Sequence, residues 1–133
     1  MRSCLVDGEI ATHVPADDRA LAYGDGVFET LAVVGGQPRF WQQHMNRLAL
    51  GCERLDIPQP PQEVLLREVL TAAAGQPQAI VRIQVTRGSG GRGYAPPQPA
   101  TPRRIISAHD WPRGMDSDRQ NGVEAVLCET RLA

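Results

Sequence analysis

Hydrophobic and polar residues follow two different periods along this chain, and each period predicts one kind of element. Between residues 79 and 87, AIVRIQVTR, the two types alternate, so Val81, Ile83 and Val85 fall on one face of a strand. Similar runs, several of them bounded by Asp-Gly or Gly-Gly turn signals, predict further strands. The strands expected in this way span residues 2–6, 9–13, 27–34, 37–41, 79–87, 103–109 and 123–132.

Two segments have the period of an amphipathic helix. In the first, apolar residues recur from Trp41 to Leu55 at spacings of four, three, four and three. The second runs from Gln62 to Ala73 and is stopped by Gly75. Both helices are expected to cover the same side of the sheet.

These elements describe an α+β fold, a mostly antiparallel sheet of six to seven strands with two helices packed on one face. A length of 133 residues suits a single domain with a real core. Residues 18–24 are expected to form an irregular loop in which Tyr23 either approaches a site or simply packs its ring. The polar residues 113–122 are expected to form an exposed excursion.

Composition argues against several classes of function. A formal net charge of −1 gives no reason to expect nucleic acid or an anionic membrane as a partner. No apolar run is long enough for a membrane span or a signal peptide, so a cytoplasmic location is expected. Cys4, Cys52 and Cys128 fit neither a disulfide framework nor a metal site, so no metal is expected, and we interpret all three as small buried side chains.

His44 and Arg47 are the first candidates for chemistry. They lie three residues apart in the first helix and therefore share a face. An arginine in such a position can hold a phosphate or a carboxylate through its planar fork. The alternative is a solvated arginine on an amphipathic helix, and spacing alone does not decide between the two.

Residues 88–94, GSGGRGY, are the second candidate. Four glycines permit left-handed backbone conformations and close approach to a ligand. Arg92 and Tyr94 alternate with glycine and could aim at one spot, while prolines in 95–102 stiffen the exit, an arrangement suited to clamping a carboxylate. The alternative is a flexible surface turn. The loop lacks the ending of a nucleotide P-loop, and no helix follows it.

Three blocks resemble, in order and spacing, the N-terminal half of the class IV (fold type IV) pyridoxal-phosphate enzymes: GDGVFET at 24–30, HMNRL at 44–48 and TRGSGGRGY at 86–94. This family includes the D-amino-acid and branched-chain aminotransferases and aminodeoxychorismate lyase, and GSGGRGY is most similar to the lyase. The resemblance implies the N-terminal domain of the D-amino-acid aminotransferase-like fold, pyridoxal 5′-phosphate as cofactor, a substrate with carboxylates, and a homodimer.

The same resemblance implies roles for four residues. Arg47 matches the arginine that contacts the cofactor phosphate, and Arg92 and Tyr94 match positions that bind the substrate carboxylate. Thr30 matches a threonine that the lyases place near the substrate, although an ordinary strand threonine is an equally good interpretation. Phe28 and Tyr94 stand where D-amino-acid aminotransferases have tyrosine and histidine, and both departures favour the lyase.

The implied reaction eliminates pyruvate from 4-amino-4-deoxychorismate and leaves p-aminobenzoate for folate synthesis. In the family a lysine holds the cofactor covalently, but all 14 residues counted as lysine or arginine here are arginines. Arginine cannot replace that lysine because its guanidinium stays protonated. We therefore expect residues 1–133 to be the small domain of a longer enzyme whose lysine-bearing domain is missing, to bind the cofactor non-covalently at best, and to be inactive alone.

Two alternatives stay open. The chain could be a fragment of a D-amino-acid or branched-chain aminotransferase, or a non-catalytic domain that binds an anion or dimerises.

Overall fold

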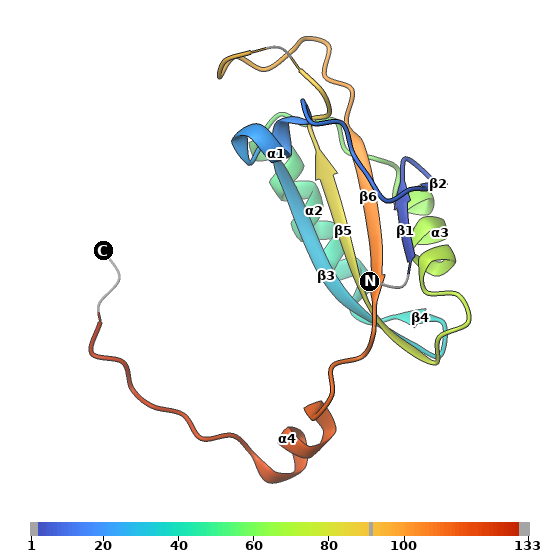
Figure 1. Ribbon diagram of the computed structural model, residues 1–133, viewed down its shortest axis with the longest axis vertical. Coiled ribbons are helices and arrows are strands. Elements are labelled where there is room, and N and C mark those ends of the chain that lie inside the picture. The colour runs from blue at the N-terminus through green and yellow to red at the C-terminus, as the bar shows by residue number, and fades with distance from the viewer. Residues whose placement is uncertain (1–2, 91, 131–133) are drawn as a thin grey trace.

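The computed structural model describes residues 3–90 and 92–130. Over these residues a six-stranded sheet has the order β2-β1-β6-β5-β3-β4, with every neighbouring pair antiparallel (Figure 1). The elements are β1 (Ser3–Val6), β2 (Glu9–Ile10), α1 (Arg19–Tyr23), β3 (Gly26–Val34), β4 (Gln37–Pro38), α2 (Trp41–Arg54), α3 (Gln62–Ala72), β5 (Gln78–Thr86), β6 (Arg103–His109) and α4 (Met115–Asn121).

The three long strands β3, β5 and β6 form the centre of the sheet and give it two different faces. Val81, Ile83 and Val85 of β5 are fully buried, whereas Arg82 and Gln84 between them are only half-buried on the other face. The alternation seen in the sequence is therefore confirmed.

Helices α2 and α3 cover one face of this sheet (Figure 1). Met45, Leu48 and Cys52 bring the apolar stripe of α2 against the sheet, and α3 contributes Leu65 and Val69. Burial of each large side chain contributes about 1.5–3 kcal/mol. The predicted α+β architecture with two helices on one face is confirmed.

The strand predicted at 123–132 is wrong over the residues that the structure describes. Residues 123–130 form no strand and run away from the sheet (Figure 1), with Val126 and Leu127 87% and 98% exposed. A strand needs an accessible sheet edge as well as alternating side chains, and the edges here are the short strands β2 and β4. Residues 131 and 132 lie outside the described residues.

The same segment corrects the interpretation of the cysteines. Cys52 of α2 is buried as predicted, but Cys4 is only half-buried and Cys128 is exposed, so the prediction is wrong for these two. Burial raises the pKa of the Cys52 thiol.

Residues 18–24 are a short helix rather than an irregular loop. The side chain of Asp18 accepts from Ala20 N at 2.9 Å and caps the start of α1, and Gly24 ends the helix at φ 66°. Both capping signals are present in the sequence. The excursion expected at 113–122 also contains a helix, α4, and the strands expected at 9–13 and 37–41 shorten to β2 and β4.

Candidate functional site

A buried carboxylate, Glu29, holds the two helix residues that the sequence indicated. Glu29 lies on the face of β3 that α2 covers, and 2% of it is exposed. Arg47 donates from Nε to Oε1 at 2.6 Å and from Nη2 to Oε2 at 2.5 Å, while Nδ1 of His44 lies 2.6 Å from Oε2. The predicted shared face of His44 and Arg47 is thus confirmed, and it points at one carboxylate.

This ion pair fixes the charge of both partners. Burial by itself raises the pKa of Glu29, but hydrogen bonds from Arg47 and His44 outweigh burial and leave the pKa below its ordinary value. The hydrogen bond to Glu29 raises the pKa of Arg47. At neutral pH Glu29 is therefore an anion and Arg47 a cation.

The guanidinium of Arg47 is anchored on one side and open on the other. Its side chain is 71% exposed, and its hydrogen bonds to other described residues use Nε and Nη2 only. Nη1 and the second N–H of Nη2 can therefore donate to an anion that arrives from solvent. This donor set fits a phosphate group. The solvated-arginine alternative accounts for the exposure but not for the anchoring.

Glu29 was not singled out from the sequence, although a signal for it was present. The inward-facing positions of β3 are Val27, Glu29, Leu31 and Val33, so one charged residue interrupts an apolar row. A charge at an inward position of a strand requires a partner. The cations of α2, the next helix along the chain, are the natural candidates.

The glycine-rich loop is fastened to α1. Arg19 donates from Nη1 to the carbonyl of Gly93 at 3.1 Å and from Nη2 to the carbonyl of Tyr94 at 3.2 Å. The amide of Gly93 donates to the hydroxyl of Tyr23 at 3.0 Å, and the rings of Tyr23 and Tyr94 lie 5.9 Å apart. The sequence left open where Tyr23 lies, and the structure places it against this loop. Arg92 and Tyr94 are both exposed, and Gly91 lies outside the described residues.

A buried ion cluster supports the base of the loop. Asp25 accepts from Nε of Arg19 at 2.7 Å and from Nε of Arg87 at 2.8 Å. Burial by itself raises the pKa of Asp25, but the bonds from the two arginines outweigh it and lower the pKa. Nη1 and Nη2 of Arg87 donate to the carbonyls of Asp56 and Leu55, the first two residues after α2.

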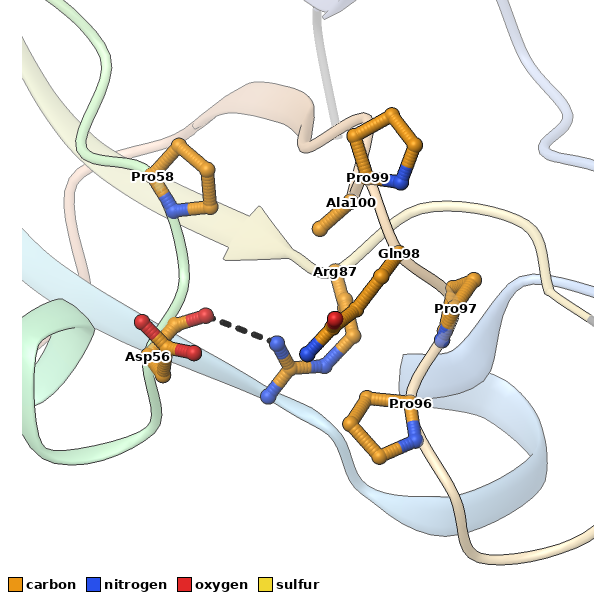
Figure 2. Close-up of a pocket in the computed structure, with 8 residues that line it drawn as sticks. All are labelled: Asp56, Pro58, Arg87, Pro96, Pro97, Gln98, Pro99 and Ala100. Atoms are coloured by element: carbon orange, nitrogen blue, oxygen red, sulfur yellow. Dashed lines mark hydrogen bonds between the residues drawn. The ribbon is translucent and has the colours of Figure 1, made fainter.

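A hollow of about 470 Å³ lies beside Arg87, between Asp56 and the proline-rich segment 96–100 (Figure 2). Each of the three guanidinium nitrogens of Arg87 already donates one hydrogen bond to a protein acceptor, and only 8% of its side chain is exposed, against 71% for Arg47. Arg87 is therefore held by the protein and far less open to an anion from solvent than Arg47 is.

Thr30 lies on the opposite face of the sheet from Glu29, because side chains alternate along β3. The predicted site residues thus lie in three places: Arg47 on α2, Thr30 on the open sheet face, and Arg92 with Tyr94 on the loop. The hydrogen bonds of Arg47 and of the loop, among the described residues, share no residue.

The described residues contain neither a cluster of metal ligands nor a membrane-spanning helix. No group of three or more histidine, cysteine, aspartate or glutamate side chains there could hold a metal ion. None of the helices in that part of the chain is long and apolar enough to cross a bilayer.

Sequence comparison connects this geometry with known proteins. The family model described as amino-transferase class IV matches residues 26–133. Aminodeoxychorismate lyase of Vibrio harveyi is 37% identical over 127 residues, which are 96% of this chain and 47% of that protein. The bifunctional aminodeoxychorismate lyase / D-amino acid transaminase of Mycobacterium tuberculosis is 31% identical over 140 residues, 96% of this chain and 45% of that protein.

Solved structures agree. The crystal structure of 4-amino-4-deoxychorismate lyase from Pseudomonas aeruginosa has a TM-score of 0.81 at 46% identity and covers 90% of this chain and 44% of that chain. The PLP-bound form of a hypothetical aminotransferase from Mycobacterium tuberculosis has a TM-score of 0.74 at 28% identity, with 90% and 43% covered. The chain spans slightly less than half the length of these relatives.

Proposed function

The chain belongs to the class IV amino-transferase family, and on that premise we propose that it forms the anion-binding part of a pyridoxal-phosphate-dependent aminodeoxychorismate lyase. The proposed reaction eliminates pyruvate from 4-amino-4-deoxychorismate and leaves p-aminobenzoate, a folate precursor. Support for the lyase comes from the names of the relatives at 37% and 46% identity, whereas purely aminotransferase relatives match less closely. The observation that carries the proposal is the anchored, outward-facing fork of Arg47.

Arg47 is proposed to bind the cofactor phosphate. Glu29 directs the guanidinium, and the exposed N–H groups leave room for phosphate oxygens without opening the core. When bound, pyridoxal phosphate supplies an electron sink. This sequence contains no lysine, so we propose non-covalent binding to these residues and a covalent anchor in the second domain of a longer protein.

Arg92 and Tyr94 are proposed to bind a substrate carboxylate. Arg19 and Tyr23 hold the loop through backbone groups of residues 93 and 94. The side chain of Arg92 stays exposed, and that of Tyr94 is 90% exposed beside the ring of Tyr23, so both can meet a ligand. Thr30, exposed on the open face, is proposed to orient the substrate or a water molecule.

We also propose a homodimer, as in the family resemblance. Sedimentation of the purified protein at several concentrations tests this part of the proposal.

Phosphate binding is the direct test of Arg47. Inorganic phosphate and pyridoxal phosphate are titrated into the 133-residue chain by calorimetry, with Arg47→Ala as the variant and exposed Arg54→Gln on the same helix as the control. Arg47→Ala is expected to lower the affinity for both ligands by about tenfold or more, because the charge-assisted hydrogen bonds of the guanidinium are lost. Equal affinity in the two variants contradicts the assignment. Borohydride treatment is expected to leave no lysine-type cofactor adduct, since no lysine is present.

The reaction itself is tested in a chimera. Residues 1–133 replace the matching segment of the Pseudomonas aeruginosa lyase, and p-aminobenzoate formation is measured beside D-amino-acid transamination. The second assay is included because the Mycobacterium tuberculosis relative is named for both activities. A chimera that folds and binds pyridoxal phosphate but transaminates without forming p-aminobenzoate contradicts the lyase proposal.

A further inference from the structure

The open face of the sheet carries an arginine with an unmet hydrogen bond. Arg82 lies in β5 directly opposite Thr30 of β3. Its guanidinium carbon is 4.1 Å from the centroid of the Phe28 ring. Nε of Arg82 is buried and has no hydrogen-bond partner among the described residues. A buried donor without an acceptor is destabilising and is rare in native proteins, so an acceptor is expected there.

The stacking on Phe28 determines which ligand groups can bind to Arg82. It occupies one flat face of the guanidinium, so hydrogen bonds to a ligand would form at the N–H edge. A planar carboxylate matches that edge, because its two oxygens can accept two parallel N–H bonds. Phe28 is 58% exposed, so part of its side chain offers an apolar surface for a flat substituent.

A pocket of about 250 Å³ surrounds this pair. Strands β3 and β5 and both ends of α1 line it, through Gly26, Val27 and Phe28, through Arg82, Gln84, Val85 and Thr86, and through Ala20 and Gly24. The volume is below the range of roughly 300–1,000 Å³ of sites for drug-sized ligands, so one small ring fits better than a whole cofactor. Through α1 the pocket adjoins the loop, since Tyr23 of α1 accepts from Gly93.

We propose that this pocket binds the ring carboxylate of the substrate, with Arg82 as its fork donor and Phe28 against the ring. The inference rests on the proposed lyase function, whose substrate carries two carboxylates. Arg92 and Tyr94 account for one of them, and Arg82 accounts for the other. Gln84 lines the same pocket and can contact a polar substituent.

The test uses 4-aminobenzoate, which retains the ring carboxylate, and aniline, which lacks it. The Nε–Hε resonance of Arg82 in the 133-residue chain is expected to shift with 4-aminobenzoate and not with aniline. Arg82→Gln is expected to lower the affinity for 4-aminobenzoate by at least about tenfold. Arg82→Lys is expected to lower it by less, because lysine keeps the charge without the planar fork. Arg54→Gln, an exposed arginine on α2, is the matched control and is expected to bind like the wild type.

Two results overturn the inference. One is equal 4-aminobenzoate affinity in wild type and Arg82→Gln. The other is a wild-type Arg82 resonance that does not move at millimolar 4-aminobenzoate, a result that needs no folded variant. Inorganic phosphate is titrated into the same samples, and its dependence on Arg47 decides the proposed function separately.

Discussion

Single residues explain why a surface arginine in this chain is ready for an anion. Arg47 is exposed like any solvated helix residue, yet Glu29 beneath it fixes two of its nitrogens. Glu29 in turn is kept ionised by those bonds although it is buried. The position of Arg47 was apparent from the sequence, but its anchor depends on contact between residues 18 apart.

Gly88 is a second position where one residue decides the local structure. It has φ +86°, and an added Cβ would lie 2.0 Å from the carbonyl oxygen of Thr101. Gly88→Ala is expected to lower the free energy of unfolding by about 3 kcal/mol or more, because neither the backbone conformation nor the space suits a side chain. Urea denaturation measures the loss.

Gly35→Ala is the matched control for this prediction. Gly35 also has a positive φ of +59°, but nothing lies within 4 Å of its added Cβ. A loss of only about 1–2 kcal/mol is expected there, from backbone strain alone. Equal losses in the two variants would show that close packing at Gly88 is unimportant.

At the scale of elements, α1 and the glycine-rich loop behave as one unit. The helix has five residues, too few to be stable alone. Its Arg19 donates hydrogen bonds to the carbonyls of Gly93 and Tyr94, which lie 74 and 75 positions further along the chain. Asp25 holds Arg19 and Arg87 together below the loop. At residues 93 and 94 the loop is thus a rim fastened to α1, whereas the sequence left a flexible turn open as an alternative.

Removal of Arg19 should loosen this rim without opening the sheet. Arg19→Gln is expected to speed tryptic cleavage after Arg92 several-fold, because two carbonyl contacts and the link to Asp25 are lost. Cleavage after Arg113, an exposed residue outside the rim, is the internal control. An unchanged ratio of the two cleavage rates would mean that other contacts hold the loop.

For the whole molecule, two lowered carboxylate pKa values couple stability to pH. The pKa values of Asp25 and Glu29 lie below their ordinary values of 3.8 and 4.5, because hydrogen bonds from arginine and histidine partners outweigh the effect of burial. Their contribution to stability is therefore complete above pH 4.5 and is lost as the pH falls through the lower folded-state values. The loss occurs because the unfolded chain binds protons before the folded chain does.

Acid denaturation should show this directly. The urea midpoint of the wild type is expected to fall steeply below pH 4.5. Glu29→Gln and Asp25→Asn are expected to be less stable at neutral pH and to have shallower acid slopes, since each removes one of the titrating groups. If the urea midpoint of a variant falls with pH as steeply as that of the wild type, the replaced carboxylate does not couple stability to pH.

The sequence by itself determined the central strands, the two long helices and the two-faced sheet, because hydrophobic period and capping act between neighbours in the chain. It also indicated Arg47, Arg92, Tyr94 and Thr30 as candidates, which stay predictions. Only the tertiary structure decided which charges meet: Glu29 with Arg47, and Arg19 with the loop. It also decided that residues 123–130, which alternate like a strand, pair with neither edge of the sheet. Such pairings depend on which distant segments come together, and no local pattern specifies that.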